Sequence, residues 1–251
     1  MLIAVAGGTG TAGRHAVAAA EAAGHEVRVL SRSAGVDLVS GSGLAEALDG
    51  VAAIIDAAKP ETLEPGQASE FFRVAAANLQ REAAARGVRH IVTLSIVGID
   101  RASSFGFYRA QLERERTTRE GPVPVTIMRA TQFHEFPAQM IARTRRGDRA
   151  SIYDMRSQPV AARTVGAVLA ELAAGEPLGR APDLGGPRPE RLLELARLFA
   201  ATRGLDLTIE PDTGSMAGVP ADALLPGPDA RLEGPSFDEW LNGEDATALT
   251  I

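Results

Sequence analysis

The first half of the chain alternates short apolar runs with longer segments in which apolar residues recur at helical spacing. The apolar runs predict strands at residues 2–6, 25–30, 36–38, 51–56, 90–95 and 123–129. The intervening segments predict helices at residues 14–23, 43–48, 68–86 and 108–118, with Gly24 and Gly87 ending the first and the third. Such alternation is typical of a parallel sheet covered by helices, so we expect an α/β fold with a Rossmann-type doubly wound sheet.

The second half of the chain is less regular. It predicts strands at residues 157–160 and 205–210 and helices at residues 161–174 and 190–202. Between Pro211 and Pro235, nine of 25 residues are Gly or Pro, which predicts a long irregular connection. This connection is either a surface loop or a flap over a functional site.

The loop between the first strand and the first helix carries glycines at a spacing of three. Two of them allow a sharp turn and a close approach of the backbone to a pyrophosphate resting on the helix N-terminus. The third allows the helix to pack closely on the strand. In this strand–turn–helix context the loop predicts a dinucleotide site, not an ordinary turn. The residues expected to bind the dinucleotide here are Gly7, Thr9, Gly10, Thr11, Ala12 and Gly13.

The end of the second strand indicates which dinucleotide is bound. An NAD site usually has an acidic residue here, whereas this chain has Ser31, Arg32 and Ser33. A guanidinium between two hydroxyls suits a 2′-phosphate, and Arg14 is a candidate for a second guanidinium. We therefore predict NADP(H) as cofactor, an NADP(H)-binding core at residues 1–131, and a small C-terminal substrate-binding portion at residues 132–251. The second portion is expected to be interleaved with the core in one compact domain.

Composition narrows the functional classes. The 251 residues include no cysteine, which excludes disulfides and thiolate metal sites and favours a cytoplasmic location. A net charge of −6 argues against a nucleic-acid partner, and no apolar run approaches the ~18 residues of a membrane span. The first residues have no basic segment, so we expect no signal peptide. No metal site is expected. Lys59 is the one lysine, and it follows a predicted strand at the cofactor side, where it contacts either a ligand or solvent.

Five segments in order resemble the NmrA-like, NAD(P)H-binding group of atypical short-chain dehydrogenases/reductases: residues 7–13 (GGTGTAG), 30–33 (LSRS), 94–98 (LSIVG), 129–133 (RATQF) and 158–160 (QPV). The resemblance covers residues 1–202. It implies that Asp37 and Leu38 border the adenine and that Ala57 and Ala58 lie beside the cofactor. It also implies that Ser95, Thr131 and Gln132 lie near the nicotinamide.

Reductases of this group commonly carry a Tyr-x-x-x-Lys pair on the helix after the fifth strand. In this chain Phe107 and Gln111 stand at those positions, so the usual proton donor and its lysine are missing. Gln111 keeps its place beside the cofactor. Three side chains remain as catalytic candidates. Ser95 is expected to position a carbonyl, Tyr108 reaches the site if the helix begins late, and His134 follows the sixth strand at the cleft.

Five aromatic residues fall between residues 105 and 136, where they suit a flat, apolar substrate. We therefore predict an NADPH-dependent reductase of a ketone on a bulky, polycyclic secondary metabolite, similar to tailoring ketoreductases of angucyclinone-type antibiotic pathways. The alternatives are a redox-inert NADP(H) sensor of the NmrA type and a non-redox isomerase or cyclase. No membrane or nucleic-acid partner is expected, and the protein is expected to be a monomer or homodimer. The five aromatic residues are Phe105, Phe107, Tyr108, Phe133 and Phe136.

Overall fold

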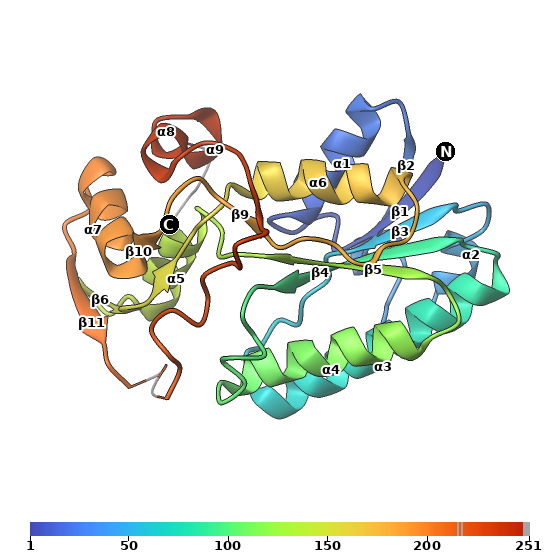
Figure 1. Cartoon of the computed structure of the whole chain (residues 1–251), viewed down its shortest axis with the longest axis horizontal. Helices are drawn as coiled ribbons and strands as arrows, with labels where there is room; N and C mark the ends of the chain where they lie inside the picture. The colour runs from blue at the N-terminus through green and yellow to red at the C-terminus, as the bar shows by residue number, and fades with distance from the viewer. Residues whose placement is uncertain (215, 217, 248–251) are drawn as a thin grey trace.

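A parallel β-sheet lies at the centre of the molecule, and the other elements pack around it (Figure 1). The computed structural model describes residues 1–214, 216 and 218–247. The strand order is β2-β1-β3-β4-β5-β9-β12, with β8 also paired to β5, and each of these neighbouring pairs is parallel. The α/β, Rossmann-type prediction is therefore confirmed. The strands are β1 Leu2–Ala6, β2 Glu26–Leu30, β3 Ala53–Asp56, β4 His90–Ile96, β5 Val125–Ala130, β8 Gly179–Arg180, β9 Leu184–Gly185 and β12 Arg231–Leu232.

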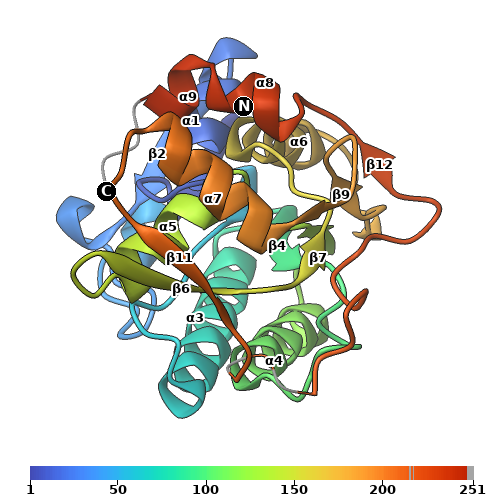
Figure 2. The ribbon, with the colours of Figure 1, turned by 90° about the vertical axis from the view of Figure 1, so that its left-hand side faces the viewer.

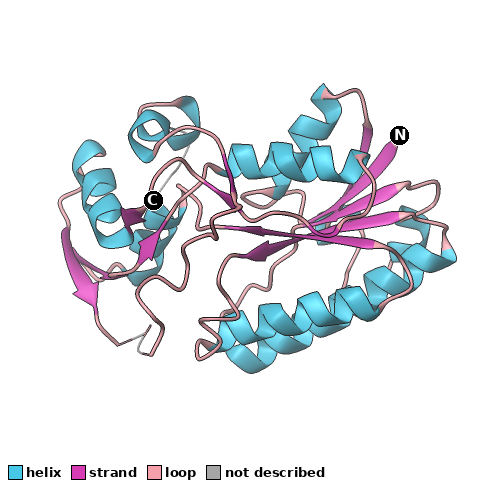
Figure 3. Cartoon of the chain, viewed as in Figure 1, coloured by secondary structure: helices cyan, strands magenta, loops and turns pink. Residues whose placement is uncertain are grey.

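Helices cover both faces of the sheet (Figures 1 and 3). Helices α1 and α6 pack together on one face, and α3 and α4 pack together on the other. The core strands are buried along almost their whole length, as expected of a sheet with helices on both sides. The core helices are α1 Gly13–Ala22, α2 Leu44–Ala47, α3 Pro65–Ala85, α4 Gly106–Glu120 and α6 Ala162–Ala174, with a 3₁₀ turn, η1, at Arg32–Ala34.

A smaller lobe lies beyond the carboxyl ends of the central strands (Figures 1 and 2). It contains two short sheets, β6 with β11 and β7 with β10, and its apolar core is separate from the clusters that line the central sheet. Yet β8, β9, β12 and α6, all from the second half of the chain, belong to the central layers. The lobe elements are α5 Phe136–Thr144, β6 Arg149–Tyr153, β7 Arg156–Ser157, β10 Glu190–Arg191, α7 Leu192–Thr202, β11 Thr208–Asp212, α8 Phe237–Leu241 and α9 Glu244–Thr247.

Several sequence expectations differ from this structure. Residues 36–38 form a loop and not a strand, because the Asp37 carboxylate accepts the backbone N–H groups of Val39 and Ser40 at 2.8 Å and closes a turn. Helix α3 begins at Pro65, three residues earlier than expected, because Glu64 caps it through the N–H groups of its first turn. Helix α5 and strand β6 were not expected at all.

The connection after β11 is irregular over most of its described length, as its glycines and prolines predict, apart from the short strand β12. It is anchored to the loop after β4, where the Arg101 guanidinium donates to the Leu225 carbonyl at 2.7 Å. Ala223 and Leu224 are buried in the core of the smaller lobe. Whether this segment also closes over a ligand stays a prediction.

Candidate functional site

A cavity of about 850 Å³ opens at the carboxyl ends of the parallel strands. This edge is where ligands bind in open α/β sheets. Eighteen of the sequence-predicted residues line it, from the glycine loop at one end to the β5–α5 segment at the other. They are Gly7, Thr9, Gly10, Thr11, Ala12, Ser31, Arg32, Ser33, Asp37, Leu38, Ala57, Ala58, Lys59, Ser95, Tyr108, Gln111, Thr131 and Gln132.

The glycine loop forms one wall of the cavity with its backbone. Gly7 has a φ of +75°, and a Cβ there would lie 2.7 Å from the Ala57 carbonyl oxygen. A Cβ on Gly13 would lie 2.1 Å from the Gly7 carbonyl oxygen, so only glycine allows α1 to begin this close to the strand. Gly13 itself lies beneath the loop, outside the lining. The N-terminus of α1, the positive end of the helix dipole, therefore faces the cavity at Thr11 and Ala12.

The end of β2 forms the rim beside this loop. Arg32 is largely exposed and pairs with Glu61 across the rim. The Ser31 and Ser33 hydroxyls share a hydrogen bond at 2.9 Å. Arg14, expected as a second guanidinium, lies outside the cavity. It is exposed on α1, where its charge acts on Asp245 and its Nε lies 3.4 Å from His15.

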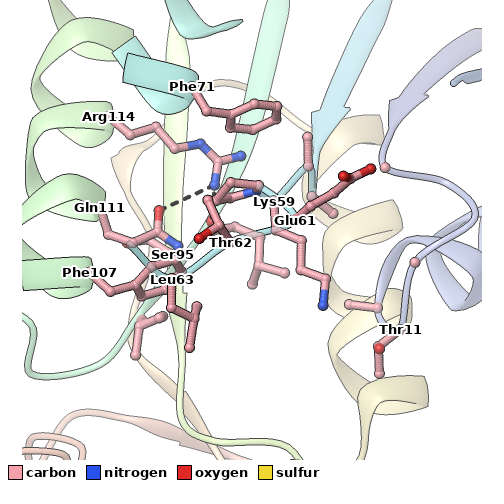
Figure 4. A pocket seen from close by; sticks show the side chains of 18 of the residues that line it. Thr11, Lys59, Glu61, Thr62, Leu63, Phe71, Ser95, Phe107, Gln111 and Arg114 are labelled. Atoms are coloured by element: carbon pink, nitrogen blue, oxygen red, sulfur yellow. Dashed lines mark hydrogen bonds between the residues drawn. The ribbon is translucent and has the colours of Figure 1, made fainter. Parts of the chain in front are cut away.

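The opposite wall is made by helix α4, at the positions where the Tyr-x-x-x-Lys pair was expected. Figure 4 shows Phe107, Gln111 and Ser95 together on one side of the cavity, with Thr11 on the other. Gln111 accepts a hydrogen bond at 3.3 Å from Arg114, a lining residue that sequence reasoning missed. The Arg114 guanidinium is 3% exposed, forms an ion pair with Asp56 at 2.7 Å, and lies over the Phe72 ring.

Ser95 is held by a buried network that also escaped prediction. Its hydroxyl donates to the Glu115 carboxylate at 2.6 Å, and Arg129 donates to the same carboxylate at 2.7 Å and 2.9 Å. Burial alone would raise the pKa of Glu115, but hydrogen bonds from Arg129 and Ser95 and the arginine charges outweigh it, so the pKa lies below its ordinary value. Glu115 therefore stays ionised, and the Ser95 proton points toward it. Glu115 is therefore a carboxylate base next to Ser95 that the sequence analysis did not identify, although its lowered pKa makes it a weak base.

Tyr108 lies in the lining although α4 begins at Gly106, two residues earlier than expected, so the late start on which its access was expected to depend is not needed. Burial, together with nearby Tyr153, raises the pKa of its phenol, and a hydrogen bond with Gln132 offsets only part of that increase. Its ring packs edge-on against Phe105 at 5.0 Å. Thr131 also lines the cavity, but its hydroxyl donates to the Gln158 carbonyl at 2.6 Å.

His134 does not face the cavity, which corrects its assignment as a catalytic candidate. Its ring lies 5.5 Å from those of Phe237 and Trp240, and its Nε2 lies 2.9 Å from the Pro235 carbonyl oxygen. Burial lowers the pKa of His134 to about 4, despite that hydrogen bond. It is therefore a neutral residue of the core of the smaller lobe.

Lys59 follows β3, and its side chain extends into the cavity toward the Thr11 side (Figure 4). The residues described contain no group of three or more acidic or histidine side chains placed to hold a metal ion. Nor does any described helix combine the length and apolar character that crossing a bilayer requires.

No protein-family model matches this chain. It is 36% identical over 142 residues to the (4-alkanoyl-5-oxo-2,5-dihydrofuran-3-yl)methyl phosphate reductase of Streptomyces griseus. The match covers 53% of this chain and 48% of that protein, so it spans about half the length of this curated relative.

Solved structures resemble the chain over almost its whole length. MoeE5 in complex with UDP-glucose and NAD has a TM-score of 0.72 at 16% identity, with 98% of this chain and 95% of that one covered. Triphenylmethane reductase of Citrobacter sp., complexed with NADP(H), has a TM-score of 0.63 at 18% identity (89% and 90% covered). A short-chain dehydrogenase/reductase superfamily protein from Agrobacterium tumefaciens with bound NAD has a TM-score of 0.62 at 19% identity (96% and 90% covered). At these identities the likeness shows the fold, a Rossmann-type α/β sheet with a lobe at its carboxyl edge.

Proposed function

We propose that the chain is an NADP(H)-dependent oxidoreductase of the NmrA-like group that reduces a conjugated ketone on a bulky, flat and apolar secondary metabolite. A polycyclic ketone is one such compound. The proposal combines the cavity, the Streptomyces griseus reductase as a relative, and neighbours of the same fold that bind NAD or NADP(H). It includes a cytoplasmic location and a monomer or homodimer, on the sequence grounds given above.

The residues present fit a dinucleotide. The wall at Gly7 and Gly13 has no room for a Cβ, and the α1 N-terminus beyond it supplies backbone N–H groups for a pyrophosphate. Arg32, with Ser31 and Ser33, lies at the rim for a 2′-phosphate, because a guanidinium and hydroxyls together bind phosphate oxygens. When bound, the cofactor supplies the hydride.

The hydrogen bond from the Ser95 hydroxyl to Glu115 is the observation that supports a conjugated ketone as the hydride acceptor. With Phe107 and Gln111 in place of the usual pair, no lining side chain near Ser95 is an efficient general acid. Hydride addition to an isolated ketone produces an alkoxide, which needs a proton at once. Addition to a carbon conjugated with a carbonyl instead produces an enolate, whose charge is delocalised onto oxygen and which water can protonate later. A site of this composition suits the second acceptor.

The relative's name describes a compatible compound, because its dihydrofuran double bond is conjugated with both an alkanoyl group and a ring carbonyl, which are attached to the same alkene carbon. The aromatic side chains around the substrate end of the cavity suit a flat body of this kind. The aromatic residues that line the cavity are Phe71, Phe105, Phe107, Tyr108, Phe133, Phe136 and Tyr153.

The test compares NADPH oxidation with matched pairs of ketones, one saturated and one conjugated, among them polycyclic ketones and acyl dihydrofuranones. We expect turnover of the conjugated ketones only. When the NADPH carries deuterium at its transferable position, product analysis should find that deuterium on the β-carbon of the former double bond. Equal turnover of the saturated members would overturn the acceptor assignment.

The missing pair also favours a second candidate, a redox-inert NADP(H) sensor that binds a partner protein. Tight NADPH binding without turnover of any ketone in the panel would favour this sensor over the reductase. The lining of aromatic and apolar side chains beyond the dinucleotide wall favours the reductase, since a sensor needs no substrate pocket.

A further inference from the structure

The cavity lining is positive in a protein whose net charge is −6. It contains four cationic side chains, Arg32, Lys59, Arg114 and Arg143, and two acidic ones, Asp37 and Glu61. Positive charge gathered in a cleft raises the local concentration of anionic ligands. A phosphate-rich cofactor accounts for the charges near the glycine loop, so the position of each cation decides whether one remains for the substrate.

Two of the four cations are already neutralised by partners within the protein. Arg32 pairs with Glu61 at the rim, and Arg114 pairs with buried Asp56. Lys59 and Arg143 make no ion pair or hydrogen bond with the residues that the structure describes. Lys59 extends toward the glycine loop, where the cofactor is proposed to bind (Figure 4). Of these two unpaired cations, Arg143 is therefore the one available to bind a substrate.

Arg143 lies on the side of helix α5 that faces the cavity. Phe136, Gln139 and Arg143 are three and four residues apart on α5, so they share the helix face that lines the cavity. The Gln139 amide donates to the Thr11 hydroxyl at 3.3 Å, which fixes this face beside the α1 N-terminus. Arg143 follows one turn later, about 6 Å further along the helix axis.

The neighbours of Arg143 are a phenol and an apolar side chain. Tyr153 of β6 and Met216 also line the cavity, and Tyr153 lies close enough to Arg143 for the charge of Arg143 to act on its phenol. Burial raises the pKa of Tyr153; the charge of Arg143 opposes this rise and that of Asp212 adds to it, so the hydroxyl stays neutral and able to donate. Asp212 pairs in register with Tyr153, and its carboxylate accepts the Gly214 N–H at 2.9 Å.

We infer that Arg143, together with the Tyr153 hydroxyl, binds a phosphate monoester carried by the substrate. A guanidinium fork matches two phosphate oxygens, and a phenol supplies a third donor. The inference rests on the proposed function and deepens it, because it makes the substrate a phosphorylated conjugated ketone. The relative from Streptomyces griseus is named for a phosphate ester, which agrees with this class.

The test measures binding and does not depend on turnover. Protein saturated with NADP⁺, which fills the 2′-phosphate site, is titrated calorimetrically with an acyl dihydrofuranone methyl phosphate and with the corresponding free alcohol. We expect the ester to bind on the order of 10–100-fold more tightly, the range of a charged hydrogen bond. Arg143→Gln should remove this difference while leaving the affinity for the alcohol unchanged, and Arg143→Lys should restore part of it.

Arg116→Gln is the matched control, since Arg116 is an exposed arginine of α4 outside the cavity. It should retain the full preference for the ester. Equal affinity for ester and alcohol in the unchanged protein, no binding of the ester, or a preference that survives Arg143→Gln would each overturn the inference. Failure of the proposed function has a different signature, namely ester binding that depends on Arg143 without oxidation of NADPH.

Discussion

The two ends of the cavity differ in which parts of the chain form their walls. At the glycine-loop end the wall is backbone, and the ion pair at its rim, Arg32 with Glu61, has side chains 71% and 80% exposed. At the Ser95 end the wall is side chains, and the ion pair behind it, Arg114 with Asp56, has side chains 3% and 4% exposed. The first end is held by local chain geometry. The second is held by buried charges from segments distant in sequence.

This difference has energetic consequences. An exposed ion pair contributes little to stability because water and salt screen it, so the rim pair is free to exchange Glu61 for a ligand. A buried pair contributes less than its geometry suggests, but removing one partner leaves a buried charge without compensation. Substitutions should therefore affect binding at the first end and folding at the second.

The largest effect is expected for Arg114→Met. This change leaves the Asp56 carboxylate buried without its ion pair and should lower the free energy of unfolding by about 3–5 kcal/mol. Chemical denaturation checks it. The double variant Arg114→Met with Asp56→Asn removes both charges and should recover a substantial part of the loss. A single variant as stable as the unchanged protein would show that water reaches this pair and that the two ends do not differ in this way.

The sequence predicted the two ends unequally for the same physical reason. The glycine loop and the Ser31–Ser33 segment are short local patterns, and all but Gly13 and Arg14 of the residues named from them line the cavity. The network around Ser95 joins residues from β4, α4 and β5, and no spacing in the sequence brings them together. One signal was present: residues 108, 111 and 115 repeat at helical spacing, which places Glu115 on the inner face of α4.

His134 and Arg143 show the limit of such reasoning in the C-terminal portion. A histidine after a core strand was expected at the cleft, but the loop turns it toward Phe237 and Trp240, more than 100 residues later in the chain. Arg143 is missed because α5 was not expected, and without the helix its face is undefined. Both depend on packing in the smaller lobe, which the periodicity of this half does not specify.

A second prediction concerns Glu135, beside His134, which is fully buried and accepts the Ala162 N–H at 3.3 Å. Burial raises the pKa of Glu135 from 4.5 to about 7, so the folded state holds its proton more tightly than the unfolded state. The contribution of this group to stability is present at low pH and is lost as the pH rises from about 4.5 to about 7. Glu135→Gln lacks this loss and should gain on the order of 3 kcal/mol relative to the unchanged protein across that range.

Thermal or chemical unfolding of both proteins between pH 4 and pH 8 checks this difference. His134, with its lowered pKa, contributes the opposite slope between about pH 4 and 6.5, but it does so in both proteins and cancels. A difference between the two proteins that stays constant with pH would show that Glu135 is ionised in the folded state.

The third prediction tests the exposed end. Arg32→Ala should weaken NADPH binding by about 1–3 kcal/mol, because a charged hydrogen bond to the 2′-phosphate is lost, and should change NADH binding little. Fluorescence titration with both cofactors measures the ratio. Arg14→Ala is the control, since Arg14 lies outside the cavity and should leave both affinities unchanged. If Arg32→Ala weakened the binding of NADPH and NADH equally, the 2′-phosphate would not bind at the end of β2.

The smallest effect is expected for Tyr108→Phe. A general acid contributes about 10²–10⁴-fold to the rate, and Tyr108 is the remaining phenol near the place where the usual one is missing. Its raised pKa and its hydrogen bond with Gln132 make it a structural phenol, and proton delivery by water does not require it. The variant should therefore retain most of kcat for a conjugated ketone, and its pH–rate profile should match that of the unchanged enzyme. A loss of kcat within the general-acid range, together with a shifted pH–rate profile, would identify Tyr108 as the proton donor. The donor would then lie one residue after Phe107, the position at which the family's tyrosine was expected.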